Sequence, residues 1–124
     1  MLGQSDLQAL GKFIQELAKR VRLKSFGFQH VDSYDDLYDG PGVYVQKGWS
    51  GRKRVGKSAV SLRRRVRRSN REHSEILGGV REVYQKPLPE ANREEVQRVE
   101  RKFIDALCTK KSRNPKLGGN KRRS

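Results

Sequence analysis

The feature that most constrains the fold is a predicted β-hairpin near the middle of the chain. Residues 42–46 are β-branched and aromatic, with Tyr44 between Val43 and Val45, which is typical of a strand. Residues 48–51 are rich in glycine and predict a turn, and residues 52–55 are expected to return as a second strand. The fold is therefore expected to contain an antiparallel pair of strands.

Three more elements follow the hairpin. Residues 59–73 predict a helix, residues 80–84 a third strand after the turn at Gly78 and Gly79, and residues 90–107 a last helix. The order after residue 40 is therefore β-β-α-β-α. We expect an α+β fold in which a small three-stranded antiparallel sheet is flanked by helices.

The chain before the hairpin predicts an N-terminal extension. Ser5 and Gln8 have capping-box spacing, and residues 23–30 and 33–41 are expected to be a connector and a loop. An apolar stripe at helical period follows the cap, made of Leu7, Leu10, Ile14, Leu17 and Val21. We therefore expect an amphipathic helix with its connector over residues 1–33 and a main domain over residues 34–124. The helix offers a surface for a homodimer.

The charge of the chain points to a polyanionic partner. The 124 residues include 29 Lys and Arg against 14 Asp and Glu, a formal net charge of +15. A monomer with this charge repels itself, so nucleic acid is the expected partner. An anionic membrane surface and a role in solubility alone are the alternatives. From Thr109 onward the tail carries basic residues and no acidic one, which predicts partial disorder.

The apolar residues indicate a cytoplasmic location. No apolar run approaches the roughly 20 residues that a membrane span needs, and residues 1–8 lack the features of a signal peptide. The single cysteine, Cys108, cannot form an internal disulfide and sits among apolar residues, so we expect it in the core in a reducing compartment. If the source is a bacterium or a phage, association with the nucleoid is expected.

Residues 51–58 read GRKRVGKS and fit the phosphate-loop pattern G-x-x-x-x-G-K-[ST] in every position. Such a loop must join a buried strand to a helix in a parallel α/β sheet. Here the residues between the glycines are basic and are expected to lie on a hairpin strand. No later apolar strand ends in an Asp that could hold magnesium. We therefore reject nucleotide binding in this segment.

A tyrosine and a helix of arginines form the first candidate site. Tyr44 alternates with its valine neighbours and so faces the other side of the sheet, as an ordinary strand residue also would. The predicted helix 59–73 has an inward stripe of Leu62 and Val66, and Arg65 lies beside it. Arginine binds phosphate through two parallel hydrogen bonds, although a solvated basic face is the alternative. The expected nucleic-acid contacts are Arg52, Lys53, Lys57, Arg63, Arg64, Arg67, Arg68 and Arg71.

Glu100 is a charged residue at an apolar position of the last helix. It is spaced four residues from both Val96 and Ile104, so it points into the face that these residues bury. A lone carboxylate there is costly unless a cation or hydrogen-bond donors meet it. One carboxylate with waters suits magnesium, whereas a snorkelling or arginine-paired glutamate is the alternative. Glu90, Glu94 and Glu95 lie on other faces and are expected at the surface.

Five segments in a fixed order carry a resemblance to a known family. They are Pro41-Gly42-Val43-Tyr44-Val45, Arg54-Val55-Gly56-Lys57-Ser58, Leu62-Arg63-Arg64-Arg65-Val66, Val99-Glu100-Arg101-Lys102-Phe103-Ile104 and Asn114-Pro115-Lys116-Leu117-Gly118-Gly119-Asn120. In these segments, and in the expected β-β-α-β-α order, residues 38–120 resemble the GIY-YIG nuclease superfamily. Each segment is weak alone, but five in order at plausible spacings are fairly specific.

The resemblance implies a role for each matching residue. Gly42-Val43-Tyr44 stands for the first triplet and Arg54-Val55-Gly56 for the second, whose tyrosine is Arg54 here. Arg65 would be the catalytic arginine, with Arg64 as the alternative because the spacing from Gly56 is one residue longer than usual. Glu100 would be the metal ligand, and Asn120 or Asn114 the stabilising asparagine. The histidine often found one turn after the arginine is Ser69 here, and His73 lies a further turn on.

The implied activity is that of a divalent-metal-dependent endodeoxyribonuclease. Mg²⁺ or Mn²⁺ on Glu100 would touch the scissile phosphate, Tyr44 would orient or deprotonate the attacking water, and Arg65 would stabilise charge on the phosphoryl oxygens. Arg54 or Lys57, as a neighbouring cation, would favour the phenolate form of Tyr44. Double-stranded DNA is the expected substrate, with RNA or branched DNA as alternatives.

Two non-enzymatic interpretations remain open. The main one is a non-catalytic nucleic-acid-binding module on the same fold, which the missing second tyrosine favours. The other is a ribosome-associated or RNA-packaging protein, which the basic tail favours. Trp49, on the hairpin turn, could stack on an unpaired base in either case.

Overall fold

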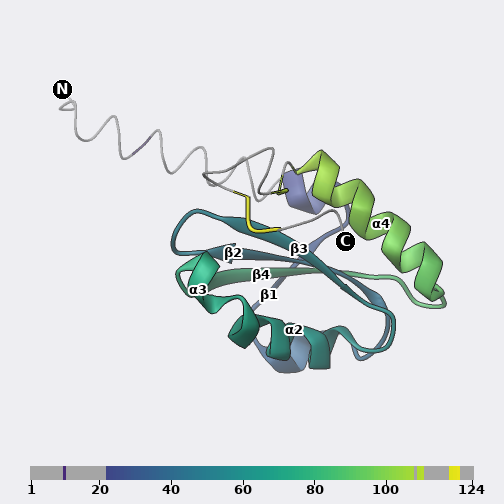
Figure 1. The fold of residues 1–124 in the computed structure, drawn as a ribbon. Helices are drawn as coiled ribbons and strands as arrows, with labels where there is room; N and C mark the ends of the chain where they lie inside the picture. The colour runs from purple at the N-terminus through teal and green to yellow at the C-terminus, as the bar shows by residue number, and fades with distance from the viewer. Residues whose placement is uncertain (1–9, 11–21, 108, 111–117, 121–124) are drawn as a thin grey trace.

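The fold was described from a computed structural model, which defines residues 10, 22–107, 109–110 and 118–120 (Figure 1). Its elements are β1 (Gln29–Val31), the 3-10 helix η1 (Tyr34–Asp36), β2 (Gly42–Gly48), β3 (Lys53–Ser58), α2 (Leu62–Glu72), α3 (Ser74–Leu77), β4 (Val80–Pro87) and α4 (Arg93–Ala106). The predicted α+β class is confirmed, and the order after residue 40 differs from the prediction only by the short helix α3, which follows α2. The predicted N-terminal helix lies outside the described residues apart from Leu10, as do Cys108, Asn114 and most of the basic tail.

The sheet has four antiparallel strands in the order β1-β4-β2-β3, one strand more than predicted. The added strand β1 pairs with β4 and places Val31 opposite Val83. Its segment was expected to be a connector because three residues are too few to show an alternating pattern. The residues before β1 also belong to the core, since Leu23 and Phe28 are buried. Among the described residues, no helix has the length and apolar character that crossing a bilayer requires.

The sheet lies between two helical layers (Figure 1). Val43, Val45 and Val55 point to the face that α4 covers, where they pack in the larger core cluster. Tyr44 points to the opposite face and packs with Leu62 and Val66 of α2. The alternation predicted for Tyr44 is therefore confirmed, because successive strand residues point to opposite faces.

β3 is longer than expected and forms an edge of the sheet. It runs to Ser58 rather than to residue 55 and pairs with β2 over its whole length, from Gly42 opposite Ser58 to Lys47 opposite Lys53. Most of the phosphate-loop pattern therefore lies on an antiparallel edge strand and not in a loop between strand and helix. This geometry supports the rejection of nucleotide binding.

α2 begins at Leu62 rather than at residue 59 because Ser61 caps it. The Ser61 hydroxyl accepts the Arg64 N–H at 3.3 Å and donates to Asp39 at 2.6 Å. Leu62 and Val66 are fully buried, which confirms the predicted inward stripe. The helix therefore presents one apolar face to the sheet and leaves its other faces to the arginines.

α4 begins at Arg93 rather than at residue 90. Glu90 has a φ of 70°, a left-handed conformation that a helix cannot include, and Asn92 caps the helix by accepting the Glu95 N–H at 2.9 Å. Val96 and Ile104 are buried as predicted, and so is Glu100 between them. The same helix therefore both closes the core and carries the candidate carboxylate.

Candidate active site

Tyr44 is fully buried against the backbone of Gly56. The two residues are direct partners across β2 and β3, and a Cβ atom on residue 56 would collide with the tyrosine ring and hydroxyl. Only glycine leaves room for the ring at this position. The third residue of the segment Arg54-Val55-Gly56 therefore has a packing role, which is to seat Tyr44.

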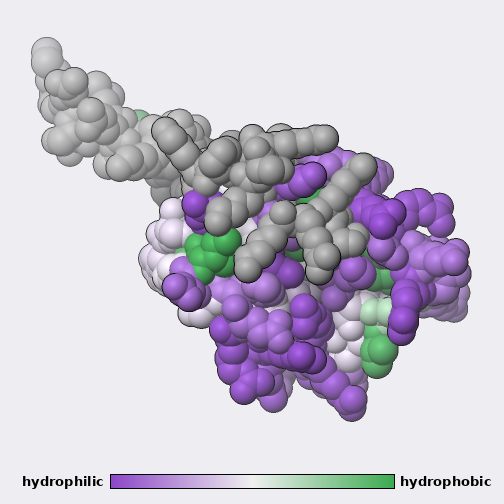
Figure 2. Space-filling view, in the orientation of Figure 1, coloured by the Kyte–Doolittle hydropathy of each residue, from purple (hydrophilic) through white to green (hydrophobic). Residues whose placement is uncertain are grey.

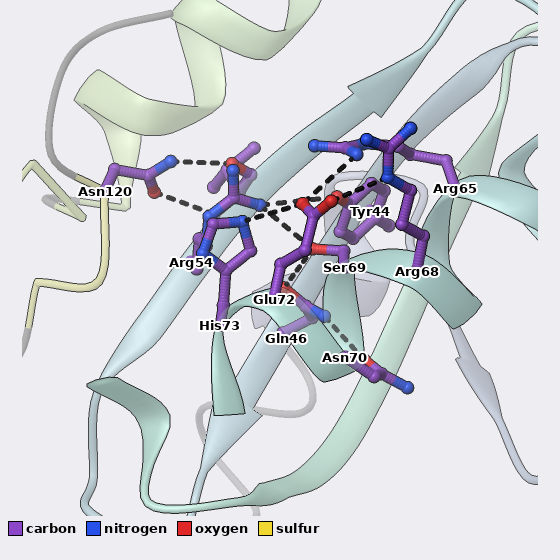
Figure 3. Close-up of polar contacts among 11 residues, drawn as sticks. Tyr44, Gln46, Arg54, Arg65, Arg68, Ser69, Asn70, Glu72, His73 and Asn120 are labelled. Atoms are coloured by element: carbon purple, nitrogen blue, oxygen red, sulfur yellow. Dashed lines mark hydrogen bonds and ion pairs between the residues drawn. The ribbon is translucent and has the colours of Figure 1, made fainter. Parts of the chain in front are cut away.

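Arg54 connects the sheet to α2. Its Nη1 atom lies 3.3 Å from the Tyr44 hydroxyl and 3.3 Å from the Ser69 hydroxyl, and both oxygens accept from it (Figure 3). Arg54 thus occupies the place next to Tyr44 that the resemblance gives to a second tyrosine. Ser69, which stands where a histidine was expected, serves as its acceptor on the helix.

A chain of polar side chains runs from the buried Ser69 and Gln46 to the partly exposed Asn70 and the exposed Tyr34, and sequence reasoning did not identify it. The Ser69 hydroxyl donates to Gln46 Oε1 at 3.1 Å, Gln46 Nε2 donates to Asn70 Oδ1 at 2.5 Å, and Asn70 Nδ2 donates to the hydroxyl of Tyr34. One signal was present in the sequence. Gln46 is two residues from Tyr44 on the same strand face, and a buried amide requires polar partners. The network fixes Ser69 and thereby the orientation of Arg54.

Arg65 lies on the side of α2 that carries Ser69. The two residues are four positions apart, and Ser69 in turn accepts from Arg54. The alternative residue Arg64 is exposed and lines a groove on the outer face of α2. The geometry therefore favours Arg65 over Arg64 as the arginine near Tyr44.

The partner of Arg65 is Glu72, the last residue of α2. Arg65 Nη1 lies 3.5 Å from Glu72 Oε2, and Arg68 Nε donates to Glu72 Oε1 at 2.6 Å (Figure 3). The hydrogen bond from Arg68 holds the pKa of the Glu72 carboxyl below its ordinary value, and the charges of Arg65, Arg68 and His73 act in the same direction. Sequence reasoning described this helix by its arginines and assigned no role to Glu72.

Glu100 has a basic partner, as its burial required. Its Oε1 lies 3.0 Å from Lys57 Nζ, with side-chain exposures of 6% for Glu100 and 32% for Lys57. The partner is a lysine from β3 rather than the arginine that was considered. Lys57 pairs with Val43 across the hairpin, so it points to the α4 face of the sheet.

The candidate residues are divided between the two faces of β3. Tyr44, Arg54 and Arg65 lie on the α2 side, whereas Lys57 and Glu100 lie on the α4 side. The described residues therefore do not bring the candidate tyrosine, arginine and glutamate together on a single face. A β-strand occupies only about 4.8 Å of a sheet. β3 is an edge strand, so its outer edge borders both of these faces.

Asn120 covers part of this outer edge. Its side-chain amide accepts the Val55 N–H at 2.8 Å and donates to the Val55 carbonyl at 2.7 Å, while the Gly119 N–H donates to the Lys53 carbonyl at 2.7 Å. Arg52 holds the same segment through the Gly118 carbonyl at 2.6 Å. Asn120 thus makes the kind of contact expected of a stabilising asparagine. The segment 118–120 covers β3 at residues 53–55.

The basic surface over α2 is divided between internal and outward contacts. Arg63 donates to the carbonyls of Leu37 and Asp35, so this cation supports the fold, as does Lys57 on the opposite, α4 face through Glu100. The side chains of Arg64, Arg67 and Arg71 are exposed on the outer face. The surface over α2 is mainly hydrophilic in Figure 2. The outer arginines are therefore the best placed of the predicted phosphate contacts.

Trp49 is 70% exposed on the turn between β2 and β3, in agreement with the predicted hairpin. The guanidinium of Arg81 lies 5.8 Å from its ring centroid, a cation–π arrangement. An exposed aromatic ring beside a cation is suited to stacking on a base. Such stacking stays a prediction.

The side chains around Glu100 fit only a metal that substrate helps to hold. In the part of the chain that the structure describes, no three His, Cys, Asp or Glu side chains gather into a metal-binding group. Magnesium is often held by one or two carboxylates together with substrate phosphates and waters. Glu100, with a buried carboxylate whose basic partner is the partly exposed Lys57, matches that lower requirement.

Comparisons of the chain with models of protein families, with curated proteins and with solved structures gave no significant match.

Proposed function

We propose that this protein is a metal-dependent endonuclease that hydrolyses phosphodiester bonds of nucleic acid, with double-stranded DNA as the preferred substrate. The observation that carries the proposal is the arrangement around β3. Tyr44 is seated on Gly56 with Arg54 at its hydroxyl, and the next residue of the strand, Lys57, binds the buried carboxylate of Glu100. The β-β-α-β-α order, with the short helix α3 added after α2, and the net charge of +15 support the same proposal.

Tyr44 acts on the attacking water in this scheme. Its hydroxyl is fully buried and accepts from Arg54, so water reaches it only after Arg54 turns away. Arg54 is a cation, and a phosphate at the edge of β3 is the natural group for it to turn toward. Substrate binding would then uncover the tyrosine, whose hydroxyl oxygen accepts a hydrogen bond from the attacking water and orients it toward the phosphorus.

The remaining residues bind and stabilise charge. Arg65 donates to phosphoryl oxygens as negative charge grows on them, a role that typically contributes on the order of 10²–10³ in rate. Glu100 would hold the divalent cation, with Lys57 next to it. When bound, that cation supplies charge neutralisation at the phosphate. The exposed arginines of α2 hold flanking phosphates of the backbone.

A second candidate function is nucleic-acid binding without cleavage. The complete burial of Tyr44 beneath Arg54 favours it, because a base that stays covered cannot act on water. This candidate uses the same arginines and requires no metal. The two functions therefore differ in cleavage and not in affinity.

A plasmid assay distinguishes them. Supercoiled DNA is incubated with the protein and Mg²⁺ or Mn²⁺, with and without chelator, using wild type, Glu100→Ala and the matched control Glu94→Ala on the exposed side of α4. If the protein is an endonuclease, wild type and Glu94→Ala should nick the plasmid, and chelator should stop this nicking. The Glu100→Ala variant should nick almost nothing. Equal nicking by Glu100→Ala, or none by wild type while DNA is still bound, contradicts the proposal and leaves the binding module.

A further inference from the structure

One carboxylate on α2 is surrounded by three basic side chains. Glu72 Oε1 accepts from Arg68 Nε at 2.6 Å, and its Oε2 lies 3.5 Å from Arg65 Nη1 and 3.9 Å from His73 Nε2. Figure 3 shows the three side chains converging on this carboxylate from the same helix and its end. The Glu72 side chain is 38% exposed, so a ligand from solvent can approach it.

Helix stability does not explain the charge of Glu72. It is the last residue of α2, and the C-terminal end of a helix carries a partial negative charge that opposes a carboxylate. Arg68 precedes Glu72 by four residues, which is the less favourable order for a helical ion pair. The electrostatic reason for a carboxylate here is therefore the cluster of cations rather than the helix.

A carboxylate and a backbone phosphate present similar groups to arginine. Each offers two oxygens that share one negative charge, and a guanidinium binds both with parallel hydrogen bonds. Arg65 also lies four residues before Ser69 on α2, and Ser69 accepts from Arg54. The position that Glu72 fills is thus suited in charge, size and location to one phosphate of the proposed substrate.

We propose that Arg65, Arg68 and His73 form a binding site for one backbone phosphate of nucleic acid, and that Glu72 fills this site in the free protein until the phosphate displaces it. The inference rests on the proposed function and deepens it. An isolated anion gains little binding free energy at this site, because it only replaces the contacts that Glu72 already makes. A nucleic acid binds more tightly, because the exposed arginines of α2 bind its flanking phosphates at the same time.

Removing the internal carboxylate tests this site without cleavage. Binding of a short labelled DNA duplex is measured in chelator for wild type, Glu72→Gln and Glu75→Gln, since Glu75 is an exposed residue of α3 and its change removes the same charge. We expect Glu72→Gln to bind about three- to tenfold tighter than Glu75→Gln. Its slope of log K against log salt should steepen by about one, because freed arginines hold counterions that binding releases. Adding Arg68→Ala to Glu72→Gln should reverse the gain.

Each outcome decides the proposal. Equal affinity and equal slope for Glu72→Gln and Glu75→Gln overturn it, while the nuclease proposal still depends on the Glu100 assay. If wild type binds no DNA, both proposals fail. If inorganic phosphate competes as strongly as the duplex, the site binds free phosphate and its assignment to nucleic acid is wrong. Glu72→Ala gives a second variant that keeps α2 folded, because alanine favours helix.

Discussion

The side chain of Asn120 binds both backbone groups of Val55, as the backbone of a neighbouring strand does. This contact joins the end of the chain to the edge strand that carries the candidate site. It is buried on both sides, with Asn120 only 5% exposed. The stability of β3 therefore depends on a residue that is 65 positions away in the sequence.

Replacing Asn120 should destabilise the protein. Asn120→Ala leaves the buried N–H and carbonyl of Val55 without their partner. Each unsatisfied group should lower the free energy of unfolding by up to about 1–3 kcal/mol. Urea unfolding measures the loss. Asn120→Asp is the matched control, because it keeps the acceptor for the Val55 N–H and loses only the donor to the carbonyl. A variant Asn120→Ala as stable as wild type contradicts this role.

Variants of Tyr44 and Gly56 test separately the proposed catalytic role of the tyrosine hydroxyl and the packing of its ring. Tyr44→Phe removes the hydroxyl that accepts from Arg54 and should lower stability by about 1 kcal/mol while abolishing cleavage. Gly56→Ala forces a methyl group into the ring and should cost about 1–3 kcal/mol. Thermal unfolding and plasmid nicking, measured on both variants, test the pair. Full activity in Tyr44→Phe rules out the proposed water-activating role.

The Lys57–Glu100 pair predicts an effect of metal on stability. Lys57→Met leaves the buried Glu100 carboxylate without its amine, and we expect a loss of about 1–3 kcal/mol because Lys57 is partly exposed. Mg²⁺ or Mn²⁺ should restore part of this loss by neutralising the carboxylate. In the double variant Lys57→Met with Glu100→Gln, the melting temperature should not respond to metal. The measurement is thermal unfolding with and without millimolar metal, and an equal response of both variants contradicts a site at Glu100.

Acid should weaken the start of α2 through Asp39. The hydrogen bond from the Ser61 hydroxyl, aided by the charges of Arg63 and Arg64, holds the pKa of the Asp39 carboxyl below its ordinary value of 3.8. The charged form therefore favours the folded state. Its contribution is complete above the unfolded-chain value and is lost as the pH falls through the lower folded value. Melting temperatures across this acid range should depend less on pH in Asp39→Asn than in wild type, with the exposed residue change Asp35→Asn as control.

Binding to nucleic acid should depend strongly on salt. If the arginines of α2 and their neighbours neutralise ~6 phosphates, affinity for duplex DNA falls by roughly 10³ between about 50 and about 200 mM salt. Fluorescence anisotropy in chelator measures this without cleavage. Arg64→Ala and Arg67→Ala, on the exposed face, should each reduce the slope by about one. A flat salt response contradicts binding through phosphates.

Local sequence patterns predicted most of the described fold. The alternation at Val43, Tyr44 and Val45 placed the tyrosine on the correct face, and the spacing of Leu62 and Val66 identified the buried side of α2. β1 was missed because three residues give no period, and the starts of α2 and α4 were misplaced because the caps Ser61 and Asn92 lie inside the predicted helices. Contacts between distant segments, such as Asn120 with Val55, have no local signal.

The candidate site was predicted as a set of residues and not as an arrangement. The burial of Glu100 followed from its spacing, but its partner Lys57 came from another element that helical spacing says nothing about. The division of the site between two faces of β3 follows from simple alternation of Gly56 and Lys57, once the strand is known to run to Ser58. The error was to end the strand at residue 55. Because the predicted strand ended three residues too early, strand alternation could not be applied to Lys57, and its face of the sheet was not predicted.

The lone tryptophan of this chain gives it a built-in optical reporter. Because Trp49 is solvent-exposed on the β2–β3 turn in the folded state, its emission should change little on denaturation and should be quenched when a base stacks on it. Titration with single-stranded and duplex oligonucleotides, followed by intrinsic fluorescence, thus reports whether the hairpin tip touches the ligand, and no dye has to be attached.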